Sequence, residues 1–369
     1  MSALLINPTK SILERMHLDG PLLGAIVLVC MFGLVVLYSA SGESSDMVSR
    51  QAIRFGLGLV AMLVMAQISP DRLLRWIPGM YALGIALLVL VAIIGIGRGS
   101  QRWLSFGPVQ FQPSEIMKLA VPLMTAWYLR NRILPPGLGT VAAALIIIGL
   151  PALLIFEQPD LGTAVLVTAA GIFVLFLSGV RWRLIGIAAG IMLAVLPAVW
   201  FLMHDYQRQR VLTMLDPQAD PLGAGYHSIQ SVIAIGSGAT YGKGWLNGTQ
   251  SHLEFLPERH TDFIFAVYCE EFGFVGVVVL LLAYMLIISR AFAIAMQAQT
   301  VFGRLIAGSI TMTFFIYIFV NMGMVAGVLP VVGVPLPLIS YGGTSAVTLM
   351  AGFGILMSVH THRRFNAAL

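Results

Sequence analysis

A short polar segment places groups capable of proton transfer against a long, mostly apolar run. In LPERHTDFIFAV, Glu258 and Asp262 come directly before residues 263–288, which have the length of a membrane span. An aspartate at the start of a helix can cap its free N–H groups and complement its dipole. It can also act as a general base, because the same dipole favours the ionised form that accepts a proton. The acids Glu270 and Glu271 lie about two turns further on, where either packing or function explains a charge. Both alternatives stay open.

Several cations lie near this segment or in the same long loop, and they suit an anionic ligand. An arginine fork matches the oxygens of a phosphate or pyrophosphate, and lysine adds a point charge. The alternative is ordinary solvated loop charge. The residues are Arg208, Arg210, Lys243 and Arg259.

A second polar group falls near the start of the apolar run at residues 113–130. Glu115 and Lys118 are three residues apart on one helical face, which favours an ion pair and leaves a role in a site open. Lys118 can also extend to the membrane surface. Trp103 precedes them in QRWL and is either an interfacial anchor or a stacking platform for a sugar.

These groups belong to a chain with the composition of a polytopic membrane protein. Of its 369 residues, 58% are hydrophobic and only 10% are charged, against roughly 25% charged in soluble domains. About ten runs reach the length needed to cross a bilayer. We therefore expect an all-α integral membrane protein, with one domain over residues 1–369. The expected spans are 21–40, 52–68, 76–96, 113–130, 140–156, 161–178, 184–203, 263–288, 305–328 and 341–360.

The distribution of basic residues predicts the orientation. Most lysines and arginines fall in loops on the side of the N-terminus, so both termini are expected to be cytoplasmic. One connection, residues 204–262, is far longer than the others and lies on the outer side between spans seven and eight. Its aromatic residues and spaced glycines favour an ordered, functional loop. The polar clusters gather on this same outer side.

Other classes of chemistry are not indicated. The chain has no Walker loop, no GxGxxG motif at the start of a helix and no GxSxG elbow. Its histidines lack zinc-ligand spacing, and its two cysteines lie in separate apolar runs, so neither a zinc site nor a disulfide framework is expected. The net charge of +5 is spread over short loops, so we expect no nucleic-acid partner.

Motifs along nearly the whole chain are similar to those of one family. The segments FQPSEIMKLAVPL, EQPDLGTA, DYQRQRV, DPLGAGYHSIQSVIAIGSG, FLPERHTDFIFAV, EEFGFVG and GVPLPLISYGGTS occur in that family's order. The chain resembles the SEDS proteins (shape, elongation, division and sporulation), most closely their rod-shape branch. One departure is Gln110, where relatives often carry a basic residue.

The resemblance implies a peptidoglycan glycosyltransferase that polymerises lipid II at the outer face of the bacterial inner membrane during cell elongation. It implies a class B penicillin-binding protein as partner, together with membrane lipid and other elongation proteins. No covalent cofactor is expected, and a divalent cation, Mg²⁺ or Mn²⁺, is a candidate helper; the identity of any metal ligand stays open. Asp262 matches the family's essential acid. The expected substrate-binding residues are Trp103, Glu115, Lys118, Asp160, Arg208, Arg210, Lys243, Arg259, Ser340 and Tyr341.

Two other functions remain open. A transporter that flips lipid II across the membrane needs similar polar groups, although transporters usually bind substrate near the midplane and between repeats. A non-catalytic scaffold for the cell-wall machinery would have dispensable acids on its outer loops.

Overall fold

The computed structural model describes residues 16–95, 102–106, 109–203, 205–219, 225–249 and 258–362. Helices make up nearly all of the regular structure in these ranges. The exception to the expected all-α fold is a small hairpin of two antiparallel three-residue strands, β1 (Leu104–Phe106) and β2 (Val109–Phe111). This hairpin lies in the connection that leads to the Glu115 region.

Each expected span coincides with one long helix. By length and composition, seven helices among the described residues can cross a membrane, whereas α5, α7 and α8 fall outside that group. The count of ten spans therefore stays a prediction. The helices are α2 (Gly20–Ala40), α3 (Ser45–Gln67), α4 (Pro70–Ile94), α5 (Pro113–Leu129), α6 (Leu138–Glu157), α7 (Leu161–Leu177), α8 (Trp182–Leu202), α12 (Ile264–Gln297), α13 (Val301–Val325) and α14 (Thr344–Thr361).

Charged residues explain why some helix boundaries differ from the expected ones. Helix α12 continues nine residues beyond the expected end at residue 288. It continues through Arg290 because the guanidinium of this residue pairs with Asp19, at 2.6 Å, instead of leaving the bundle. Asp19 also caps α2 by accepting a hydrogen bond from the Leu22 N–H. The pair therefore joins the first span to the eighth.

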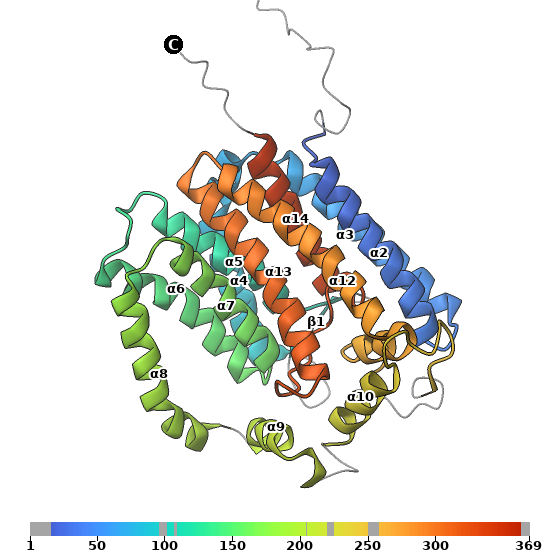
Figure 1. The fold of residues 1–369 in the computed structure, drawn as a ribbon. Coiled ribbons are helices and arrows are strands. Elements are labelled where there is room, and N and C mark those ends of the chain that lie inside the picture. The colour runs from blue at the N-terminus through green and yellow to red at the C-terminus, as the bar shows by residue number, and fades with distance from the viewer. Residues whose placement is uncertain are drawn as a thin grey trace, which may run out of the picture.

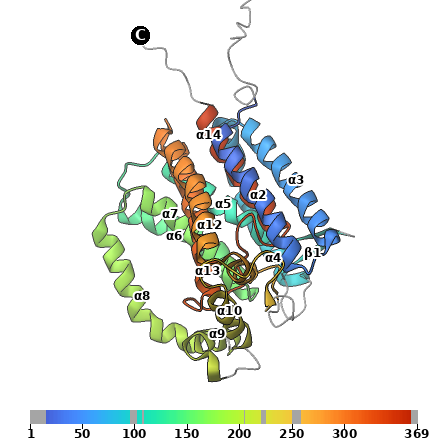
Figure 2. The same ribbon diagram turned by 45° about the vertical axis from the view of Figure 1, so that its right-hand side comes forward.

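The bundle is built around α13, the most buried of the candidate spans. Helix α13 packs against both α12 and α7, and α14 lies along α3. Helix α8 stands apart from the bundle in both views (Figures 1 and 2). Most of its described side chains are correspondingly exposed, including Trp182 at 76% and Phe201 at 78%.

The two ends of the bundle differ in what they carry. The start of α2 and the end of α14 lie together at one end, whereas α9 (Asp205–Leu215) and α10 (Tyr226–Ser237) lie at the opposite end (Figure 1). These two helices and the short 3₁₀ helix η1 (Pro217–Ala219) belong to the long connection. The expectation of an ordered loop is thus confirmed for its described parts.

Helix α12 is broken near its start. Gly273 has φ 63° and ψ −164°, which lie outside the helical region. A segment that we call the strap, residues 238–249, lies against this break. The N–H groups of Phe274 and Val275 donate to strap carbonyls, and strap N–H groups donate to the carbonyls of Glu270 and Glu271. A Cβ on Gly273 would lie 2.3 Å from a strap nitrogen, so only glycine fits there.

Candidate active site

Asp262 lies in the turn that precedes α12. Helix α12 begins at the end of the molecule that carries α9 and α10 (Figure 1). The residue at the N-cap position is Phe263, and no side chain caps the helix. Thr261 donates its hydroxyl to Glu258 instead. The half-buried Asp262 carboxylate therefore does not serve as a helix cap, and within the described residues the structure gives it no hydrogen-bond donor.

The surroundings of Asp262 make it a stronger base than an ordinary aspartate. Burial, and to a smaller extent the negative charge of Glu258, raise the pKa of its carboxyl, which is about 6. Arg210 acts in the opposite direction and lowers it. At neutral pH the group is still mostly ionised, and it holds a proton more tightly than an exposed aspartate does. Both properties suit a general base.

Asn321 holds the backbone of Asp262 in place, and the sequence analysis did not select it. This fully buried residue of α13 donates from Nδ2 to the carbonyl of Asp262 at 2.9 Å and to that of Val334 at 2.7 Å. It therefore ties the turn before α12 to the loop after α13. A buried asparagine within an apolar span was the available signal, because such a group needs partners.

Gly333 brings that loop beside the carboxylate. Its φ is +72°, in the left-handed region, and a Cβ built there would lie 3.5 Å from the Asp262 Oδ2. On the other side, the ring of His227 on α10 stacks on Phe263 at 5.8 Å between centroids. The Asp262 turn is thus held between α10, α13 and the loop after α13.

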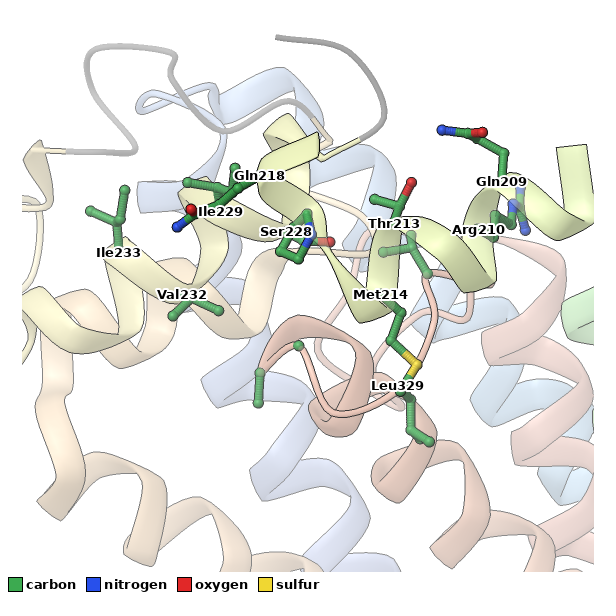
Figure 3. A pocket seen from close by; sticks show the side chains of 14 residues that line it. Gln209, Arg210, Thr213, Met214, Gln218, Ser228, Ile229, Val232, Ile233 and Leu329 are labelled. Carbon is green, nitrogen blue, oxygen red and sulfur yellow. The ribbon is translucent and has the colours of Figure 1, made fainter. Parts of the chain in front are cut away.

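Arg210 lines a pocket between α9, α10 and the end of α13 (Figure 3). The cavity has a volume of about 480 Å³. Because Arg210 also acts electrostatically on Asp262, the structure brings together these two residues that the sequence selected.

Ser340 and Tyr341 belong to a loop that is fixed by α3. The buried side-chain amide of Gln51 donates to the Ser340 carbonyl and accepts from the Gly342 N–H. The Ser340 hydroxyl accepts from the Leu336 N–H, so it supports the loop. The Tyr341 ring remains half-exposed beneath the guanidinium of Arg54. The backbone N–H of Tyr341 donates to the carbonyl of His260. Of the two, Tyr341 has the more exposed side chain, and contact of either residue with substrate stays a prediction.

Glu115 and Lys118 form the expected ion pair, at 2.6 Å, and both side chains are buried. The Lys118 ammonium lies 5.6 Å from the ring centroid of Tyr317 on α13. Tyr317 is four residues before Asn321, so the pair lies about one helical turn deeper in the bundle than Asp262. Glu115 Oε2 is buried and has no hydrogen-bond partner within the described ranges.

Asp160 has a structural role at the start of α7. It caps this helix by accepting from the Thr163 N–H, and it accepts from Gln112 at 2.8 Å. Arg102 lies 3.8 Å from the same carboxylate and also donates to the carbonyls of Gln158 and Pro159. These contacts anchor the β1–β2 hairpin to α7.

Trp103 is partly buried next to that hairpin. The structure therefore places it at the hairpin, and the choice between anchor and sugar platform stays a prediction.

Three of the selected cations are engaged elsewhere. Arg208 donates to the carbonyls of Trp200 and Phe201 at the end of α8. Lys243, on the strap, donates to Glu270 and Thr249, each at 2.7 Å. Arg259 extends towards Gly42 in the α2–α3 turn. Their expected contacts with substrate stay predictions, and the structure shows a packing role for the first two.

Within the described residues, no group of three or more histidine, cysteine or acidic side chains is arranged to hold a metal ion. Near Asp262, the described acid that acts on it is Glu258. Two carboxylates do not make a complete site, but Mg²⁺ often binds one or two carboxylates together with substrate phosphates and water.

Together, the fold and this site define a helical, multi-pass membrane protein with a carboxylate and an arginine at one end of its bundle. The profile of the FTSW_RODA_SPOVE family, described as "Cell cycle protein", matches residues 21–365. The chain belongs to this family, as its motifs indicated.

Named relatives and solved structures agree with this assignment. The chain is 55% identical to the peptidoglycan glycosyltransferase MrdB of Escherichia coli K12, over 97% of this chain and 98% of that protein. It is 37% identical to the probable peptidoglycan glycosyltransferase FtsW of Trichlorobacter lovleyi, over 92% of each. A chain of a peptidoglycan synthase complex superposes with a TM-score of 0.81 at 34% identity, covering 94% of this chain and 99% of that one. The rod shape determining protein RodA of Thermus thermophilus gives 0.70 at 30%, covering 93% and 96%.

Proposed function

We propose that this protein is a peptidoglycan glycosyltransferase of the bacterial inner membrane that polymerises lipid II during cell elongation, with Asp262 as its general base. The observation that carries the role of Asp262 is its environment. Its carboxylate is half-buried beside Arg210, is not used as a helix cap, and has a pKa raised to about 6. The 55% identity to a peptidoglycan glycosyltransferase over nearly the full chain supports the reaction.

In the proposed reaction, Asp262 takes the proton from the 4-hydroxyl of the acceptor's GlcNAc. The freed oxygen attacks C1 of the donor's MurNAc from the face opposite the pyrophosphate, and the new C–O bond forms as the bond to pyrophosphate breaks. The configuration at C1 is therefore inverted. Undecaprenyl pyrophosphate leaves with the electron pair, and Arg210 stabilises its developing charge.

The reaction is assigned to the periplasmic face. Helix α9, which carries Arg210, helix α10 and the start of α12, which follows Asp262, lie at the end of the bundle opposite the start of α2 and the end of α14. The positive-inside rule puts the latter end in the cytoplasm. The reacting sugars then meet at the outer surface, where the growing strand needs no further transport.

Partners follow from the relatives. One structural neighbour is part of a peptidoglycan synthase complex whose structure concerns the coordination of polymerization and crosslinking. We therefore expect a class B penicillin-binding protein to accompany this chain, together with other elongation proteins. A divalent cation such as Mg²⁺ or Mn²⁺ would be held mainly by the pyrophosphate oxygens, with Glu258 as the nearby protein carboxylate, and would neutralise the leaving group.

The Asp262→Asn variant tests this proposal. It keeps the size of the side chain and removes its ability to accept a proton, so glycan polymerisation should fall by about 10²–10⁴-fold. The assay gives labelled lipid II to the purified protein, with and without its partner, and sizes the products on a gel. Asp46→Asn is the matched control, because Asp46 is an exposed acid in the first turn of α3.

Normal polymer yield from Asp262→Asn would remove the base from the mechanism. The same assay separates the other functions: lipid II scrambling in liposomes without glycan ladders would indicate a flippase, and neither activity would indicate a scaffold.

A further inference from the structure

The pocket beside the candidate base has two chemically different parts. Most of its wall is apolar, formed by side chains that include Met214, Val232 and Leu329. In Figure 3, Met214 extends from α9 towards Leu329 in the loop after α13. Arg210 and Thr213 on α9 supply polar groups to the same cavity. A ligand that fills it therefore needs an apolar body and a polar or anionic end.

Thr213 provides an independent indication of a ligand. Its side chain is 8% exposed, and its Oγ1 is buried with no hydrogen-bond partner among the described residues. Buried hydroxyls normally have a partner. This hydroxyl and the Arg210 guanidinium belong to consecutive turns of α9 and line the same cavity.

The surroundings of the pocket also suit a lipid. Leu212 and Leu215 on α9 are 48% and 71% exposed, and Val328 in the loop after α13 is 63% exposed. Clusters of exposed apolar side chains mark surfaces that membrane or another partner covers. The pocket thus has apolar surface around it as well as inside it.

We propose that this pocket binds the first isoprene units of the donor's polyprenyl chain, next to the pyrophosphate at Arg210. The proposal rests on the proposed function, which defines the substrate. The donor is the substrate whose reacting carbon is bonded directly to its pyrophosphate. The acceptor reacts at its distal sugar, so its own chain begins a full disaccharide away from Asp262. Arg210 lines this pocket and also acts on Asp262, so the pocket fits the chain of the donor better than that of the acceptor.

The size of the pocket sets how much of the chain it takes. Its volume of about 480 Å³ lies in the range of pockets for small ligands, roughly 300–1,000 Å³. A few isoprene units fit this space, and the rest of the undecaprenyl chain stays in the bilayer. Chain length beyond the pocket should then contribute little to recognition.

The test compares two donors that differ only inside the pocket: lipid II analogues with one isoprene unit and with four. The wild-type protein should use the four-unit donor with a kcat/KM roughly tenfold or more above that of the one-unit donor, because the added units bury apolar surface. The Val232→Trp variant fills the pocket from α10. Its ratio of the two kcat/KM values should fall to about one.

Leu212→Trp is the matched control, because Leu212 is 48% exposed against 47% for Val232 and does not line the pocket. It should keep the wild-type ratio. Leu329→Phe is a second filling variant from a different element, in case Val232→Trp does not fold. A wild-type ratio in a folded filling variant, or an equal loss of ratio in Leu212→Trp, would overturn the proposal. If the wild-type protein polymerises neither donor nor natural lipid II, the proposed function itself fails.

Discussion

At the scale of single residues, the two neighbours of Asp262 set its basicity in opposite directions. Burial and Glu258 raise the pKa of its carboxyl, and Arg210 lowers it. A base must be ionised to accept a proton, so activity should fall as pH drops through about 6, by roughly tenfold per pH unit.

Glu258→Gln removes a negative neighbour, so it should lower the pKa of Asp262 and move the acidic fall in activity to lower pH. Arg210→Gln removes a positive neighbour and should move it to higher pH. The measurement is kcat/KM against pH for both variants, because this parameter reports the pKa values of the free enzyme. Shifts in the same direction would contradict the assignment of the acidic fall in activity to Asp262.

Asn321 gives a second prediction at this scale. Asn321→Ala removes two hydrogen bonds, to the carbonyls of Asp262 and Val334. The Asp262 turn then loses its fixed position, and kcat should fall by about tenfold or more while KM changes little. Steady-state kinetics on lipid II provides the test.

Thr311→Ala is a suitable control for Asn321, because Thr311 is also buried in α13 and its hydroxyl bonds only the preceding turn, at Ala307. The positioning role is wrong if both variants lower kcat equally, or if Asn321→Ala changes only KM.

Single residues also show what sequence reasoning could reach. It selected Asp262 and Arg210, which the structure brings together. It grouped Lys243 with them, although the structure pairs that ammonium with a carboxylate 27 residues away. Composition and spacing identify which groups carry charge, but the partner of each charge depends on how distant segments pack. Asn321 was missed for the same reason.

At the scale of elements, the break in α12 depends on the strap. The broken turn exposes backbone groups, and the strap satisfies them through four backbone hydrogen bonds. The sequence predicted one continuous span there, because EEFGFVG has no proline and a glycine alone does not reveal a break. Only the packed strap shows why the glycine is required.

The Lys243–Glu270 pair fixes the strap to this break, which leads to a prediction about stability. Lys243→Met leaves the fully buried Glu270 carboxylate without that cation. Because the Lys243 side chain is 29% exposed, the loss of stability should be smaller than the roughly 3–5 kcal/mol of a fully buried pair. The double variant Lys243→Met/Glu270→Gln should recover most of the loss. Thermal unfolding in detergent measures both. An unchanged melting temperature with lost substrate affinity would instead support the substrate contact that the sequence suggested.

At the scale of the whole molecule, the helix boundaries follow apolar run length and were largely predictable, whereas the orientation is a prediction from charge. Ile133 and Tyr241 are 91% and 82% exposed and belong to opposite sides in that prediction. Both native cysteines are buried, so their background labelling is low. In intact spheroplasts, a membrane-impermeant thiol reagent should label Tyr241→Cys and spare Ile133→Cys. Permeabilised cells should label both, and the reverse pattern in intact cells would invert the topology.

The isolation of α8 has a consequence for how freely its sequence can change. A helix inside the bundle is restricted by the shape of each neighbouring side chain, so even a small change in volume disturbs its packing. Helix α8 stands apart from the bundle, and its exposed side chains make few such demands. Apolar residues of many shapes can therefore replace one another in α8, provided that the helix stays hydrophobic enough to remain in the bilayer. Across strains, the amino-acid sequence of α8 should therefore vary while its hydrophobicity stays constant.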